Sequence, residues 1–89
     1  TIVGGAGDIG SACARVLADK VKYLTITGRT KVNLRHIAKE LSRKRKARII
    51  VETSNEKAVR GADIIIAAAS ATTSILNLDW FKPGAVVCD

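Results

Sequence analysis

The sequence predicts an α/β fold of the Rossmann type: a doubly wound parallel sheet of five strands in the order 3-2-1-4-5. Two observations support this. A glycine-rich turn directly follows a short apolar strand at the start of the chain, and strand-like segments then alternate with helix-like segments through all 89 residues. Such alternation is typical of right-handed strand–helix–strand units in a parallel sheet.

The first strand, expected over residues 1–3, and the first helix, expected over 8–18, flank the glycine-rich loop. The helix begins at Asp8, whose carboxylate suits the positive end of the helix dipole. We expect Asp8 to cap the first N–H groups and to point away from a bound anion. Apolar residues at helical spacing predict the face that packs on the sheet: Ile9, Ala12, Cys13, Val16 and Leu17.

The next segments also have clear boundaries. Residues 23–27 are rich in β-formers and end before Gly28, so they predict the second strand. Residues 31–44 carry apolar side chains at i, i+3, i+4 and i+7, which indicates a helix with one face on the sheet. The third strand is expected over 48–53, around an Ile-Ile-Val centre.

The last third of the chain continues the alternation. Ser54 or Asn55 can cap a short helix that ends near Arg60, with Gly61 as its stop. The run Ile-Ile-Ile-Ala-Ala within 63–68 predicts a central strand buried on both faces. A helical turn over 77–81 and a last strand over 85–88 complete the sheet.

The loop after the first strand carries the G-x-G-x-x-G spacing of dinucleotide-binding domains, with a further glycine before it. Glycine lets backbone N–H groups approach a diphosphate and lets the helix lie close to the strand. The helix start adds unpaired donors and a partial positive charge. The predicted contacts to the cofactor in this loop are Gly4, Gly5, Ala6, Gly7, Asp8, Ile9 and Gly10.

The end of the second strand predicts the cofactor NADP(H). NAD-binding domains place an acid about 20 residues beyond the glycines, and none stands there in this chain. Arg29 can instead pair with a 2′-phosphate, Thr30 lies at a helix start and Lys31 adds charge. The end of the fourth strand lies at the switch point of the sheet, and its small residues leave room for the nicotinamide ribose: Ala68, Ala69 and Ser70.

Composition restricts the class of protein to which the chain can belong. The apolar fraction of 47% supports a packed core, and no apolar run is long enough to span a membrane. Cys13 and Cys88 match no metal or redox spacing and suggest a reducing cytoplasm. We expect residues 1–89 to be one NADP-binding domain from a longer chain. The catalytic residues and the domain that holds a small-molecule or acyl substrate are expected outside this segment. A homo-oligomer is possible, and the sequence does not reveal its contacts.

The net charge of +7 raises the possibility of nucleic-acid binding. The densest basic run, residues 43–48, precedes the third strand and therefore lies at the edge of the sheet opposite the glycine loop. The chain has three aromatic residues, and Tyr23 and Trp80 are interpreted as packing residues. A solvated helix end explains the run more simply, so nucleic-acid binding through it is the third and least favoured hypothesis.

The segment VGGAGDIGSACARVLA resembles the glycine loop of long-chain acyl-carrier-protein reductases and predicted amino-acid dehydrogenases. This resemblance extends through residues 61–65 and 85–89 and implies an NADP domain. Gly28-Arg29-Thr30 is similar to the Asn-Arg-Thr of shikimate dehydrogenases and glutamyl-tRNA reductases, which implies that Arg29 and Thr30 bind the 2′-phosphate. Residues 80–87 resemble methylene-tetrahydrofolate dehydrogenases. The nucleophilic cysteine of the acyl reductases matches neither Cys13 nor Cys88.

The sequence therefore predicts the cofactor domain of an NADP-dependent dehydrogenase or reductase that transfers hydride, with an acyl thioester or a shikimate-like compound as possible substrate. A non-catalytic module that senses NADP(H) is the second hypothesis, and the full-length sequence would distinguish it, since a sensor would lack a downstream catalytic set of Cys, Lys or Asp.

Overall fold

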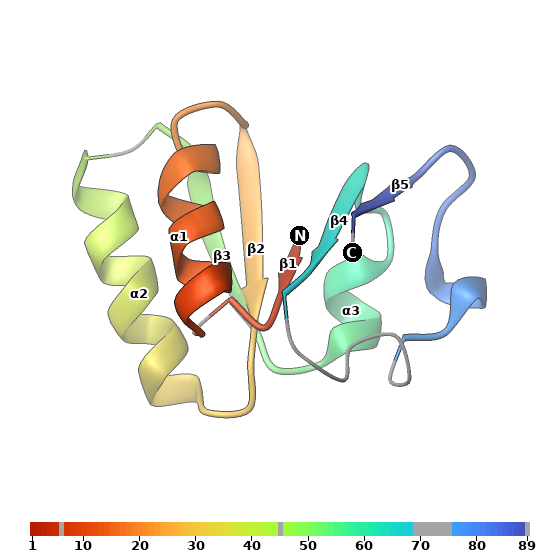
Figure 1. Ribbon diagram of the computed structural model, residues 1–89, viewed down its shortest axis with the longest axis horizontal. Coiled ribbons are helices and arrows are strands. Elements are labelled where there is room, and N and C mark those ends of the chain that lie inside the picture. The colour runs from red at the N-terminus through yellow and green to blue at the C-terminus, as the bar shows by residue number, and fades with distance from the viewer. Residues whose placement is uncertain (6, 45, 69–75, 89) are drawn as a thin grey trace.

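The computed structural model describes residues 1–5, 7–44, 46–68 and 76–88. Five parallel strands form one sheet in the order β3-β2-β1-β4-β5, which confirms the predicted fold (Figure 1). Along the chain the elements are β1 (Ile2–Val3), α1 (Asp8–Leu17), β2 (Tyr23–Thr27), α2 (Lys31–Lys44), β3 (Arg48–Glu52), α3 (Asn55–Val59), β4 (Ile64–Ala67), η1 (Leu78–Trp80) and β5 (Val86–Cys88). None of the described helices is long and apolar enough to cross a membrane.

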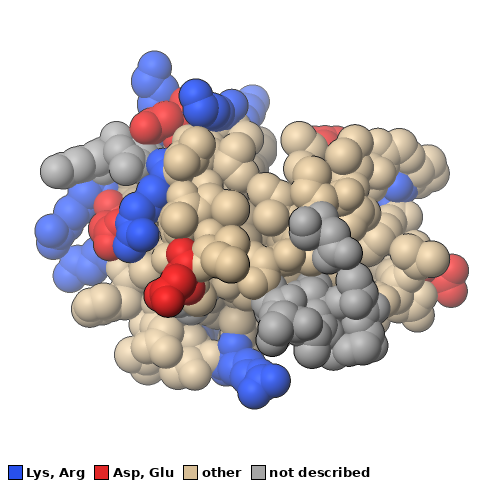
Figure 2. Space-filling model, in the orientation of Figure 1, with Lys and Arg blue, Asp and Glu red and all other residues tan. Residues whose placement is uncertain are grey.

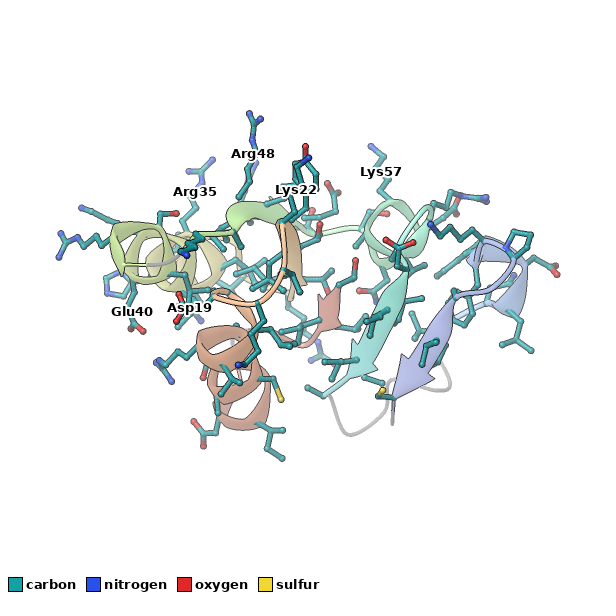
Figure 3. All side chains as sticks on the ribbon, turned by 90° about the horizontal axis from the view of Figure 1, so that it is seen from above. Asp19, Lys22, Arg35, Glu40, Arg48 and Lys57 are labelled. Atoms are coloured by element: carbon teal, nitrogen blue, oxygen red, sulfur yellow. The ribbon has the colours of Figure 1, made fainter. Side chains whose placement is uncertain are left out.

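The helices lie on both sides of the sheet. α1 and α2 cover one face over β1, β2 and β3, and α3 lies on the other (Figures 1 and 3). The larger core, between α1, α2 and the sheet, is centred on Ile2, Ile26 and Leu34. A smaller core under α3 contains Val59 and Ile65, both fully buried.

The face that α1 buries differs from the predicted one. Its fully buried residues are small, and Ala14 is central among them, whereas Ile9 and Val16 are 69% and 59% exposed. Of the predicted stripe, only Cys13 and Leu17 pack partly against the core. The helix turns its smallest side chains to the sheet because Gly10 brings its first turn against the loop backbone.

β4 is fully buried only on the face towards α3 and partly on the other, where Ile66 packs against the larger core, which corrects the prediction of a strand buried on both faces. Ile65 points towards α3 and is fully buried, whereas Ile64 is 50% exposed. Ile64 pairs with Val86 of β5, which is also exposed. Figure 2 views the face that α1 and α2 cover. On this face Lys and Arg gather around α2, while few charged residues lie over β4 and β5.

The ends of α3 follow the sequence signals. The hydroxyl of Ser54 accepts a hydrogen bond from the N–H of Lys57 at 3.3 Å, as expected of a helix cap. Gly61 has a φ of +78°, a left-handed conformation that favours glycine after a helix. The chain then turns directly into β4.

An ion pair links the start of β4 to the turn before β5. Lys82 holds the carboxylate of Asp63, and this hydrogen bond and charge lower the pKa of Asp63. A lowered folded-state pKa means that the pair stabilises the fold above the ordinary carboxyl pKa, and that this stabilisation is lost as the pH falls through the lowered value. The contribution is small because the carboxylate is exposed.

Lys82→Gln is therefore expected to raise the pKa of Asp63 towards its ordinary value, with little change in stability near neutral pH. A carboxyl NMR titration of both proteins measures this shift directly. An unchanged pKa in the variant would show that Lys82 does not hold the carboxylate in solution.

Candidate cofactor-binding site

The glycine loop is tied to the end of β2 by backbone hydrogen bonds. The N–H groups of Gly4 and Gly5 both donate to the carbonyl oxygen of Thr27, at 3.1 and 2.7 Å. Gly4 has a φ of +83°, which lets the chain turn sharply after β1. The loop is therefore fixed at the carboxyl edge of the sheet, where ligands of such folds bind.

Two of the loop glycines leave no room for a side chain. A Cβ on Gly10 would lie 2.2 Å from the carbonyl oxygen of Gly4, and a Cβ on Gly5 would lie 2.7 Å from the Cβ of Ile26. At Gly7 the nearest atom would be 3.6 Å away, an ordinary contact. Gly10 thus serves the close approach of α1 to the loop, as its place in the motif predicts.

The start of α1 leaves donors available. Gly7 is the residue before the helix, and no side chain caps the first turn. The N–H groups of Asp8 and Ile9 have no hydrogen-bond acceptor among the residues that the structure describes. The predicted cap by Asp8 is wrong because Asp8 is already the first helical residue, and its side chain is exposed. Free helix-start donors are typical of an anion site.

The residues predicted to choose the cofactor follow β2 at this same edge. Thr30 lies just before α2, where its carbonyl oxygen accepts the N–H of Leu34 at 3.2 Å. Arg29 and Lys31 are exposed, and Arg29 stands two residues after the Thr27 that holds the glycine loop. The strand neighbour of Thr27 is Glu52, whose carboxylate accepts the N–H of Ser54 at 3.2 Å.

The third predicted contact region begins beside the glycine loop. The N–H of Ala68 donates to the carbonyl oxygen of Val3 at 2.9 Å, which places Ala68 next to the end of β1. Ala6, Ala69 and Ser70 lie outside the described residues, so their predicted contacts stay predictions. The described part therefore brings together the loop, the end of β2 and the end of β4.

Sequence reasoning missed the side chain that supports the loop. Thr27 is fully buried, and its hydroxyl donates to Oδ1 of Asn55 at 3.0 Å while it accepts the N–H of Gly4 at 3.4 Å. This bond connects the loop, β2 and the start of α3. The signal available in the sequence was a threonine, rather than an apolar residue, at the last position of a buried strand.

Thr27→Val is expected to lower the free energy of unfolding by about 1–3 kcal/mol, because it leaves Oδ1 of Asn55 without its donor. Thr27→Ser keeps the hydroxyl and is the matched control. Urea unfolding followed by circular dichroism measures both. A valine variant as stable as the serine variant would contradict the role assigned to this hydrogen bond.

The model of the ornithine cyclodeaminase/mu-crystallin family matches residues 4–89, which is nearly the whole chain. This family has an NAD(P)-binding Rossmann-like domain, and its members include NAD(P)-dependent enzymes, although ornithine cyclodeaminase is a lyase-like deaminase. No curated protein matches the chain. The finer resemblances to acyl-carrier-protein reductases and shikimate dehydrogenases stay predictions.

Proposed function

The chain belongs to the ornithine cyclodeaminase/mu-crystallin family, and we propose that residues 1–89 form the NADP(H)-binding domain of an oxidoreductase. The observation that carries this proposal is the set of donors at the start of α1. Among the residues that the structure describes, the N–H groups of Asp8 and Ile9 have no acceptor, and they follow a loop that Thr27 holds at the carboxyl edge of the sheet. These donors suit the diphosphate of a dinucleotide.

The side chains after β2 support NADP(H) rather than NAD(H). Arg29 presents a planar fork of donors that can pair with both oxygens of a 2′-phosphate. The hydroxyl of Thr30 lies at the start of α2, where the helix dipole also favours an anion. Lys31 adds a positive charge at the same place.

The small residues from Ala68 to Ser70 would leave space for the ribose next to the nicotinamide. The nicotinamide, when bound, supplies the hydride. The chain's own part is to hold the cofactor so that this ring faces a substrate carried by another segment. An acyl thioester is the substrate class that the resemblance of the glycine loop favours, and the catalytic groups would come from that other segment.

Titration with NADPH and NADH, followed by nicotinamide fluorescence, tests this function. We expect both to bind and NADPH to bind about tenfold more tightly or better, a difference of roughly 1.4 kcal/mol that one charge-assisted pair can supply. No fluorescence change with either nucleotide would contradict the proposed function. Equal affinities for NADPH and NADH would agree with the diphosphate site but would contradict the role of Arg29 and Thr30.

A further inference from the structure

The α3 side of β2 and β3 presents an open stretch of sheet. Tyr23 alternates with Leu24 and Ile26, which are buried against α1 and α2, so the ring of Tyr23 lies on the opposite face. Tyr23 is 58% exposed, which corrects its interpretation as a packing residue. Arg48 lies beside Tyr23 in the parallel register, and the nearby Ile50 of β3 is 40% exposed.

Four cations extend on this same side. Lys22, Arg35, Arg48 and Lys57 all point towards the side on which α3 lies (Figure 3), and all are exposed. Among the described residues none of them forms an ion pair. The Nζ of Lys22 lies 5.7 Å from the centre of the Tyr23 ring. The basic sheet face, as we name it, consists of Lys22, Tyr23, Arg35, Arg48, Ile50 and Lys57.

This face is separate from the cofactor site. Tyr23 and Arg48 begin β2 and β3, whereas Arg29 and the glycine loop follow the carboxyl ends of their strands. The acidic neighbour on β3, Glu52, stands at the far end of the strand and accepts the N–H of Ser54. Lys22 and Arg48, the two cations nearest the exposed ring, therefore lie at the amino edge of the sheet and not at the cofactor edge.

We propose that the basic sheet face binds single-stranded nucleic acid, with a base stacked on Tyr23 and the flanking phosphates paired with Lys22 and Arg48. An exposed aromatic ring among free cations is the arrangement that such binding uses, because stacking tolerates any base and the cations follow the backbone. An acidic peptide would use the cations but would leave the ring without a matching group.

Fluorescence anisotropy with labelled oligo-U and oligo-dT of about ten nucleotides tests this proposal at near-physiological salt. We expect dissociation constants of about 1–100 μM. Tyr23→Ala and Arg48→Glu are each expected to weaken binding about tenfold, and Tyr23→Phe is expected to retain it. Arg43→Glu is the control for charge, because Arg43 is an exposed residue of α2 that does not belong to the basic sheet face.

The proposal is supported if either oligomer binds and the variants change its affinity as expected. The oligomer that binds more tightly identifies RNA or DNA as the preferred ligand. Saturating NADPH is expected to leave the affinity unchanged. No binding at this salt concentration would overturn the proposal. So would equal losses in Arg43→Glu and Arg48→Glu, an unaltered affinity in a folded Tyr23→Ala, or full displacement by polyglutamate, since each would reduce the interaction to charge alone.

Discussion

Gly10→Ala is expected to abolish NADPH binding and to lower the free energy of unfolding by about 1–3 kcal/mol, the usual cost of forcing extra atoms into a packed site. The new Cβ would lie 2.2 Å from the carbonyl oxygen of Gly4 and 2.9 Å from the Cα of Gly5. Both are backbone atoms of the loop, so α1 must move away from it. That movement displaces the N–H groups of Asp8 and Ile9 from the loop. Urea unfolding and a fluorescence titration with NADPH measure the two effects.

Gly7→Ala is the matched control for stability. Its added Cβ would meet nothing closer than 3.6 Å, and the φ of −76° at Gly7 is open to alanine. We expect its free energy of unfolding to stay close to that of the unaltered chain. Equal destabilisation by the two substitutions would contradict the close approach of α1 at Gly10.

Arg29→Asp is expected to weaken NADPH binding by well over tenfold and to leave NADH binding nearly unchanged. The substitution removes the paired donors that would hold the 2′-phosphate and puts a negative charge in their place. NADH carries a hydroxyl at this position and loses no ion pair. Parallel fluorescence titrations of the variant with the two nucleotides give the ratio of affinities.

Arg43→Asp serves as the control for this reversal of charge, because Arg43 is exposed near the end of α2 and precedes the opposite edge of the sheet. It is expected to change both affinities by less than about threefold, since an exposed charge beyond a Debye length is largely screened. Equal losses of NADPH and NADH in Arg29→Asp would show that Arg29 does not contact the 2′-phosphate.

Local signals in the sequence predicted the order of elements well. The bounds of β2 and α2 were predicted without error, because Gly28 ends the strand and the apolar spacing of the helix admits one face only. The first helix was harder. Apolar spacing favoured the stripe that contains Ile9 and Val16, but the approach of Gly10 to the loop selected the small-residue stripe centred on Ala14.

Contacts between distant parts of the chain were not visible in the sequence. Thr27 and Asn55 are 28 residues apart, and their hydrogen bond exists because α3 begins beside the end of β2. The exposure of Tyr23 has a similar origin. A tyrosine in a strand predicts burial, and only the placement of α3 over β1 and β4 leaves its ring uncovered.

Chemical-shift mapping of backbone amides during a titration with NADPH tests most directly whether the helix-start donors hold a dinucleotide. We expect the largest changes at Asp8 and Ile9, followed by Arg29 and Thr30, and little change at Arg48. Undisturbed amides at Asp8 and Ile9, with changes confined to the amino edge of the sheet around Arg48, would contradict the account.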